Sequence, residues 1–257
     1  MPKSINSGPV EWDAEVYHRV SDIQFGWAME VLDRLSLNGD ELVLDAGCGS
    51  GRVTQALADR LPRGRIIAVD ASSEMVEKAK QVLGPRADVR AVDLVRLEIE
   101  EQVDLVFSNA VFHWIADHDE LFGRLHGALA PGGRLVAQCG GEGNVAALGA
   151  AIRAVAETTI YKEHLQGFPG MWNFASAEET EVRLRGAGFE EARCWLESKR
   201  VTPEQPREFL ATVTLGPQLA RLPDDRKEGF VTDVMEKLEE PLALDYVRLN
   251  IEARKAA

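Results

Sequence analysis

Apolar residues in the first half of the chain follow two alternating spacings. Between short apolar runs, apolar residues recur every three or four positions, as at Val53, Ala56, Leu57 and Leu61. The runs themselves lie at about 42–44, 65–70, 89–92, 103–107 and 134–138. Short runs are typical of buried strands, and the longer spacing is typical of helices. We therefore predict an α/β fold in which helices cover both faces of a parallel sheet.

The spacing changes after residue 140. We expect a long helix at about 144–164, an aromatic loop at about 167–173 and a capped helix at about 176–188. A strand at about 189–202, a second helical segment at about 203–241 and a last strand at about 244–253 should follow. A helix from about Ser21 to Asn38 precedes the first strand, with Ser21 and Gln24 at capping-box spacing.

These elements predict one domain over 1–257, built on a doubly wound, mostly parallel seven-stranded sheet. Its core would comprise about 38–140, 176–202 and 243–256. The remaining helical segments, about 10–36, 141–175 and 203–242, would form a lid. Because ligands bind at the carboxyl ends of parallel strands, we expect the lid at that edge.

The most informative stretch is Leu42 to Gly51, where a strand ends in Asp45 and glycine follows at alternate positions, Gly47, Gly49 and Gly51. Glycine allows a sharp turn and a close approach to a ligand, because it has no β-carbon. The helix that follows directs its free amide groups at the same place. The pattern is typical of a nucleotide-binding turn.

The acid before the turn, Asp45, indicates which nucleotide cofactor the turn would bind. A dinucleotide site has its third glycine three residues after the second, whereas here the interval is two. Asp45 would repel a pyrophosphate by several kcal/mol at ~4 Å with an effective dielectric of ~20. S-adenosylmethionine has no phosphate and carries an ammonium and a sulfonium, so the motif favours it over NAD. An NAD-dependent oxidoreductase is the alternative on a similar fold.

Further polar residues follow the next strands. Asp70 ends the second strand about 20 residues after the last glycine, the separation at which an acid binds ribose hydroxyls. Asp93 ends the third strand, and Asn109 follows the fourth. In an open α/β sheet these residues would share the ligand-binding edge.

Four signals in this order resemble the class I S-adenosylmethionine-dependent methyltransferases: the 45–51 turn, Asp70-Ala71-Ser72, Asp93-Leu94, and Ser108-Asn109 followed by His113-Trp114. The resemblance covers about 12–140, and it implies the Rossmann-like fold of that family. Trp12, Tyr17 and the His113-Trp114 pair are most similar to the small-molecule branch that includes trans-aconitate and juvenile-hormone-acid methyltransferases. Beyond residue 140 the chain departs from that branch, so the resemblance does not indicate which molecule accepts the methyl group.

The resemblance implies a site for S-adenosylmethionine, with S-adenosylhomocysteine as product. Its methionine part would lie against Gly47, Gly49 and Gly51, with Asp45 near the ammonium and with Asn109, Tyr17 and Gln24 around it. Asp70 would bind the ribose, Ala71 and Met75 would border the adenine, and Asp93 beside Leu94 would accept from the adenine amino group.

Structural roles are open for several of these residues. Asp45 could stabilise the turn, and Asp70 and Asp93 could cap helices. The capping box with Ser21 would explain Gln24. Tyr17, like Trp12, could pack the N-terminal helix onto the sheet.

His113 is the catalytic candidate, because an ordinary histidine titrates near pH 6.5. It could also line the pocket or hold a loop, and Trp114 and Trp172 are candidates for the pocket wall. The predicted reaction is in-line transfer of the methyl group to an O, N or C atom of a small molecule. A carboxylate oxygen would need no base, whereas a hydroxyl, amine or carbon acid could use His113. A non-catalytic S-adenosylmethionine-binding protein is a further alternative.

Composition narrows the partners. The formal net charge of −13 disfavours nucleic acid. The three cysteines are far apart and lack metal-ligand spacing, so we expect neither disulfides nor a metal. Neither a signal peptide nor a long apolar run is seen, which predicts a cytoplasmic protein without a membrane partner. The oligomeric state is not indicated.

Overall fold

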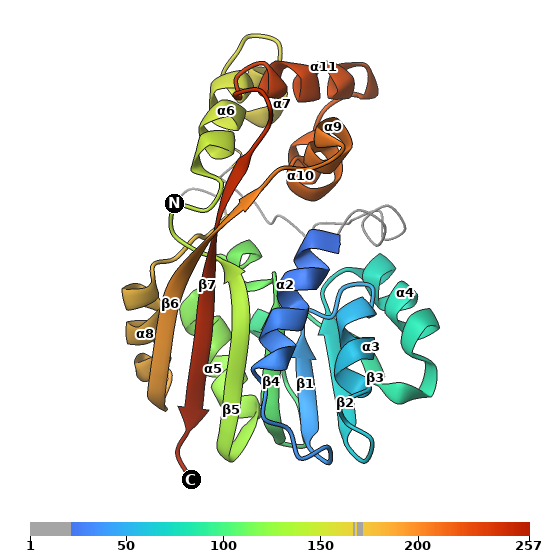
Figure 1. Ribbon diagram of the computed structural model, residues 1–257, viewed down its shortest axis with the longest axis vertical. Coiled ribbons are helices and arrows are strands. Elements are labelled where there is room, and N and C mark those ends of the chain that lie inside the picture. The colour runs from blue at the N-terminus through green and yellow to red at the C-terminus, as the bar shows by residue number, and fades with distance from the viewer. Residues whose placement is uncertain (1–21, 167, 169–171) are drawn as a thin grey trace.

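The computed structural model describes residues 22–166, 168 and 172–257. Its centre is a seven-stranded sheet in the order β3-β2-β1-β4-β5-β7-β6 (Figure 1). The strands are β1 (Leu42–Ala46), β2 (Arg65–Asp70), β3 (Asp88–Ala91), β4 (Val103–Asn109), β5 (Leu129–Gly140), β6 (Phe189–Val201) and β7 (Leu244–Lys255). The two pairs made by β7, with β5 and β6, are antiparallel and the other four pairs are parallel, so the predicted mostly parallel sheet is confirmed.

The helices cover the two faces of the sheet and form a cap beyond its end (Figure 1). They are α2 (Asp22–Asp33), α3 (Arg52–Ala58), α4 (Ser73–Leu83), α5 (His118–Ala128), α6 (Ala146–Ala156), α7 (Lys162–Leu165), α8 (Ala177–Gly186), α9 (Pro206–Phe209), α10 (Gly216–Leu219) and α11 (Asp224–Met235). Short 3-10 turns lie at Gly84–Arg86, Leu94–Arg96 and Phe112–Trp114, and a π-helical turn at Leu210–Thr214. In the described part of the chain, no helix has the length and apolar character needed to cross a membrane.

Two hydrophobic clusters sandwich the sheet. Leu42 and Leu44 of β1 pack with α5 and α8 on one face, while Val43 packs with α2, α3 and α4 on the other. Because both faces are covered, every residue of β1 is buried. This explains the unbroken apolar run from which the strand was predicted.

A third hydrophobic cluster belongs to the cap. Helices α6, α7, α9 and α11 pack there with the distal ends of β6 and β7, beyond the carboxyl ends of the parallel strands (Figure 1). Helix α2 joins the two regions, because Trp27 belongs to the cap cluster while Val31 and Leu32 belong to the sheet cluster. The assignment of this cap as a lid stays a prediction.

Three helices begin at side-chain caps, and one of them is the capped helix predicted from residue 176. Ser72 accepts a hydrogen bond from the backbone N–H of Met75, and Asp117 accepts one from Glu120. Ser176 accepts from the N–H of Glu179. These side chains satisfy amide groups that the first helical turn leaves without partners.

The prediction of one long helix at 144–164 is wrong. It is divided into α6 and α7, and the hydroxyl of Thr158 in the intervening turn donates to the carbonyl of Val155. Threonine side chains that bond nearby backbone in this way compete with helix propagation. Helix α2 likewise ends at Asp33, several residues before the predicted end near Asn38.

The segment at about 203–241 is helical as expected, but it is divided into several short helices. Pro206 and Pro217 lie in the first turns of α9 and α10, and Pro223 directly precedes α11. Proline starts a helix readily and cannot continue a preceding one, which accounts for the interruptions.

Candidate functional site

The glycine turn joins β1 to α3. The backbone N–H groups of Gly47 and Cys48 both donate to the carbonyl of Val69 on β2, at 2.8 and 2.9 Å. Gly47, Gly49 and Gly51 have φ values of +90°, +52° and +85°. These left-handed conformations are readily available to glycine, so the turn depends on these residues.

Two of the glycines differ in what surrounds them. A β-carbon on Gly47 would lie 2.2 Å from a methyl group of Val111, so this glycine is required by packing. A β-carbon on Gly49 would meet no atom of the described residues within 4 Å. With respect to these residues, Gly49 therefore borders open space at the end of β1, which is where a ligand was predicted.

Asp45 lies directly before this turn and is buried. Its carboxylate accepts a 2.6 Å hydrogen bond from the hydroxyl of Thr54 on α3. Burial raises the pKa of Asp45 to about 7; the Thr54 hydrogen bond opposes this shift and the charge of Asp70 adds to it. The turn-stabilising role that the sequence left open is thus present, and the carboxyl is poised to change charge near neutral pH.

Asp70 connects two segments at the end of β2. One carboxylate oxygen accepts from the N–H of Gly49 and the other accepts from the N–H of Ser72, both at 2.9 Å. Ala71 beside it is exposed, and Met75 on α4 is buried. The carboxylate of Asp70 therefore holds the glycine turn and the start of α4 together.

Asp93 is exposed and accepts a 3.2 Å hydrogen bond from the N–H of Val95, so it caps the short turn that follows β3. Leu94 is buried in the cluster on the α5 face. Contacts of either residue with a ligand stay predictions.

Three buried amide oxygens have no hydrogen-bond partner among the described residues. One belongs to Gln218 in the cap, and the other two are Oδ1 of Asn109 at the end of β4 and Oε1 of Gln24 in the first turn of α2. Leaving a buried acceptor unsatisfied costs about 1–3 kcal/mol. The residue after Asn109, Ala110, has a φ of +61°, which is unusual for a residue with a β-carbon. Unsatisfied acceptors and backbone strain are typical of binding sites.

His113 is buried in the turn after β4. Its Nδ1 accepts a hydrogen bond from the backbone N–H of Gly140 at the end of β5, at 3.2 Å. Burial holds the pKa of His113 well below its usual value, and the charges of Arg248 and His118 act in the same direction. The imidazole is therefore neutral, with its proton on Nε2.

His113 belongs to an aromatic cluster that also contains Trp114, Trp172 and Phe174. The ring of His113 lies 5.0 Å from that of Trp114 and 5.8 Å from that of Phe174. Phe174 stacks on Trp172 at 5.3 Å, and the two indoles are 6.3 Å apart. The structure thus brings together the three predicted pocket residues, although Trp172 is far from His113 and Trp114 in the sequence.

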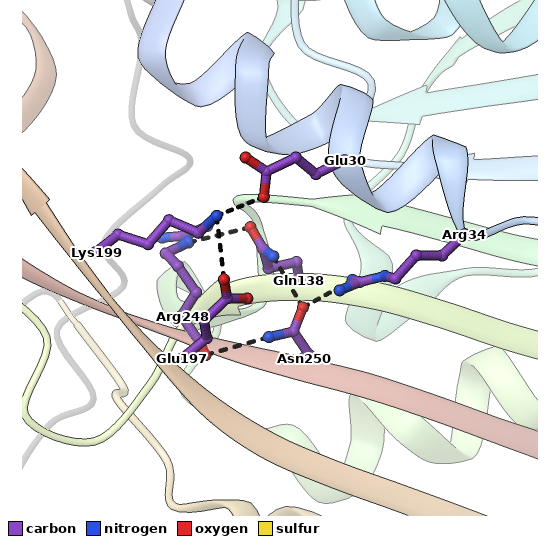
Figure 2. Close-up of polar contacts among 7 residues, drawn as sticks. All are labelled: Glu30, Arg34, Gln138, Glu197, Lys199, Arg248 and Asn250. Carbon is purple, nitrogen blue, oxygen red and sulfur yellow. Dashed lines mark hydrogen bonds and ion pairs between the residues drawn. The ribbon is translucent and has the colours of Figure 1, made fainter.

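A buried polar ladder lies next to this cluster and was missed by the sequence analysis. It consists of Gln138 on β5 and of Arg248 and Asn250 on β7, and the exposed Arg34, which directly follows α2, binds to it (Figure 2). Oδ1 of Asn250 accepts from Arg34 and from Gln138, both at 2.8 Å. Nε of Arg248 approaches Oε1 of Gln138 at 3.4 Å, and its guanidinium lies 4.9 Å from the Trp27 ring.

The register of the sheet explains the ladder. Gln138 lies opposite Asn250, and Gly140 lies opposite Arg248. Arg248 is 3% exposed and Asn250 is fully buried. A second contact ties α2 to the sheet, because Lys199 on β6 pairs with Glu30 on α2 and with Glu197 (Figure 2). The signal in the sequence was the alternation of polar residues within an otherwise apolar last strand.

Two residues singled out from the sequence, Trp12 and Tyr17, lie outside the described residues, as does Ser21 of the capping box.

The central part of the chain matches a known family. Residues 43–133, which contain the glycine turn and the ends of β2, β3 and β4, match the family model described as "Methyltransferase domain". Over these residues the chain is therefore similar to methyltransferase domains. The resemblance predicted from the sequence motifs is thereby confirmed.

Several curated proteins to which the chain is similar carry the name trans-aconitate 2-methyltransferase. The chain is 36% identical over 130 residues to that of Variovorax paradoxus, which is 50% of each chain. It is 38% identical over 128 residues to that of Methylobacterium radiotolerans, covering 50% of this chain and 49% of the relative. The chain thus spans about half the length of the curated relatives it matches.

Solved structures share the fold over nearly the whole chain. Phosphoethanolamine N-methyltransferase 2 of Haemonchus contortus, in complex with phosphomonomethylethanolamine and S-adenosylhomocysteine, superposes with a TM-score of 0.62 at 21% identity, over 95% of this chain and 57% of that one. The YcgJ protein of Bacillus subtilis superposes with a TM-score of 0.63 at 16% identity, over 92% and 99%. At this identity the likeness shows the methyltransferase fold alone.

Proposed function

We propose that the protein transfers the methyl group of S-adenosylmethionine to a small-molecule acceptor. The observation that carries this proposal is the glycine turn, in which Gly49 borders open space beside a buried acid, Asp45. The family match of residues 43–133 and the relatives named as methyltransferases support it.

The residues present fit this cofactor. An ammonium and ribose hydroxyls are donors, and the turn offers them acceptors: Asp45, Asp70 and the unsatisfied oxygens of Asn109 and Gln24. Such a donor would satisfy oxygens that are otherwise costly to bury. We assign the methionine part to the glycine turn and Asn109, and the ribose to Asp70. The contacts of Ala71, Met75, Asp93, Leu94 and Tyr17 are carried over from the resemblance.

S-adenosylmethionine supplies a methyl group on an activated sulfonium leaving group, so the protein must mainly align the acceptor and exclude water. A lone pair of the acceptor forms the new bond to carbon as the bond to sulfur breaks, which leaves S-adenosylhomocysteine. We assign the cap helices the role of a lid that excludes water, and the aromatic cluster that of an acceptor wall. Both assignments follow from their location beyond the carboxyl ends of the parallel strands.

We further propose that the acceptor atom is a carboxylate oxygen. A carboxylate is already ionised at neutral pH and needs no base. This suits a site whose histidine, His113, is neutral and already accepts a hydrogen bond at Nδ1. The positive charge of Arg248 lies close enough to His113 to influence its pKa, and it would also favour an anionic acceptor. The curated relatives are named for trans-aconitate, a carboxylate.

Thermal unfolding in the presence of candidate cofactors tests the proposal. S-adenosylmethionine and S-adenosylhomocysteine should raise Tm, because a ligand that binds the folded state adds about 2.7 kcal/mol at 100 times its Kd. Stabilisation by NAD instead would establish the oxidoreductase alternative and overturn the proposal. Release of S-adenosylhomocysteine should then be measured with trans-aconitate, other carboxylates and hydroxyl compounds. Cofactor binding without turnover of any of these would indicate the non-catalytic alternative.

A further inference from the structure

We propose that His113 and Asn173 are positioning residues: they attach residues 172–175 to the end of the sheet and thereby set the aromatic wall of the acceptor pocket. We call these contacts of His113 and Asn173 the latch. In the latch, His113 acts as a neutral hydrogen-bond acceptor and not as a general base. The link to an acceptor pocket rests on the proposed function, whereas the latch itself can be tested without it.

The hydrogen bond at Nδ1 shows that the ring of His113 is an acceptor. A ring nitrogen that accepts from a backbone N–H has no proton and no further lone pair to offer, so Nδ1 is occupied by Gly140. The proton of the neutral ring is then on Nε2, which is a donor. A base at Nδ1 would have to give up the Gly140 bond, and the resulting cation would face the positive charge of Arg248 and the ring of His118.

Asn173 joins the same two regions. Its N–H donates to the carbonyl of His113 at 2.8 Å. Its side-chain Nδ2 donates to the carbonyls of Ile115 and Ala116, both at 3.1 Å. Three backbone carbonyls in the turn after β4 are thus held by one residue from a distant loop. The loop also bonds to the sequence after β5, because the N–H of Glu142 donates to the carbonyl of Ala175 at 3.0 Å.

Close packing completes the latch. A β-carbon on Gly140 would lie 2.5 Å from Phe174, so the phenyl ring lies directly against this backbone. Trp172, Phe174, His113 and Trp114 form a continuous series, with neighbouring ring centroids 5.3, 5.8 and 5.0 Å apart. The two indoles at the ends of the series therefore depend on the hydrogen bonds of His113 and Asn173 for their positions.

Nitrogen NMR of the histidine rings tests the role of His113 without any ligand. We expect His113 as the neutral tautomer with hydrogen on Nε2, unchanged from about pH 5.5 to about pH 9. The signal is identified by its loss in His113→Gln. A ring protonated at Nδ1, or one that titrates near pH 6.5, would overturn the proposal.

Fluorine NMR of 5-fluorotryptophan protein tests the latch. In Asn173→Ala and in His113→Leu, which cannot accept from Gly140, the resonances of Trp114 and Trp172 should move or broaden. In His113→Gln, whose amide oxygen can accept that bond, they should return toward the wild-type positions. Trp195 is the internal control, because it lies on β6 against Arg34 and Arg193. Unchanged Trp114 and Trp172 signals in Asn173→Ala would overturn the proposal, even if His113→Leu fails to fold.

Calorimetry with S-adenosylhomocysteine separates this proposal from the proposed function. Asn173→Ala should bind this probe within about twofold of the wild type, because the latch shapes the acceptor side only. Failure of the wild type to bind it would contradict the proposed function and leave the tryptophan result standing. A large loss of binding in Asn173→Ala alone would contradict the assignment of the latch to the acceptor side.

Discussion

Gly47 and Gly49 share a left-handed backbone but differ in their neighbours. A β-carbon on Gly47 would collide with Val111, whereas one on Gly49 would contact no residue in the described part of the chain. The same substitution should therefore affect folding at the first position and ligand binding at the second.

Gly49→Ala should lower stability by about 1–2 kcal/mol, the cost of a left-handed alanine. Affinity for S-adenosylhomocysteine should fall more than about tenfold, which corresponds to 1.4 kcal/mol, because the methyl group occupies the space assigned to the ligand. Gly47→Ala is the matched control and should lower the urea midpoint further, since overpacking adds about 1–3 kcal/mol to the same strain. Full affinity for S-adenosylhomocysteine in a folded Gly49→Ala protein, measured by calorimetry, would contradict the assignment of Gly49 to the cofactor site.

The raised pKa of Asp45, about 7, predicts pH-dependent cofactor binding. Below pH 7 the carboxyl is mostly neutral, and above it the carboxylate can interact with an ammonium. The ratio of wild-type affinity to that of Asp45→Asn should thus rise about tenfold from about pH 6 to about pH 8. Taking this ratio removes the titration of the cofactor's own amino group, which occurs near pH 8. A ratio that is constant over this range would show that Asp45 only stabilises the turn.

Helix α2 is held to the sheet by polar contacts of its own and of the residue that follows it. Arg34, directly after α2, binds Asn250 on β7, and Glu30 pairs with Lys199 on β6. One turn before Trp27, the same helix carries Gln24, which has the unsatisfied oxygen assigned to the cofactor. The contacts of α2 with the sheet therefore also set the position of a binding residue.

Asn250→Leu should destabilise the protein by about 1–3 kcal/mol, because it leaves the buried amide donor of Gln138 without its acceptor. It also removes the acceptor of the exposed Arg34. Asn250→Asp keeps an acceptor oxygen of the same size and should lose less. Urea unfolding compares the two variants. Equal stability would mean that packing, and not the hydrogen bonds, fixes the ladder.

The elements were predicted well where local spacing determines them. The limits of β2 agree with the predicted strand, and the helix predicted from residue 176 is capped by Ser176 as expected. The helix predicted through Thr158 failed, because apolar spacing continues through a turn that side-chain hydrogen bonding favours. Periodicity records which residues are buried, and it does not show where a helix stops.

At the scale of the whole molecule, the cap has a hydrophobic core separate from the two that flank the sheet. Phe230 of α11 is fully buried there, and its ring meets that of Tyr161 edge-on at 5.0 Å. Separate cores allow one region to open while the other stays folded.

Phe230→Ala should therefore loosen the cap selectively, at a cost of about 3–5 kcal/mol. Hydrogen exchange should increase in α6 and α11 and stay slow in β1, β2 and β4. Leu125→Ala in the core on the α5 face is the matched control and should increase exchange in the sheet. Equal loosening of sheet and cap in Phe230→Ala would show a single cooperative unit.

The sequence by itself determined the alternation of strands and helices, the glycine turn and the acids at the strand ends. Each of these depends on residues that are close together in the chain, such as Asp45 and Gly47, and on the backbone preferences of those residues. Asp70 and Asn109 could also be placed at one edge, because parallel strands with helical connections leave their carboxyl ends together.

Only the tertiary structure decided which distant residues meet and what their environment does to them. Gln138 and Asn250 form a ladder because β7 runs antiparallel in one particular register, which no local pattern encodes. His113 became a buried acceptor through Gly140, 27 residues away. The pKa of Asp45 depends on the desolvation that the completed fold imposes, so its shift could not be read from the motif that contains it.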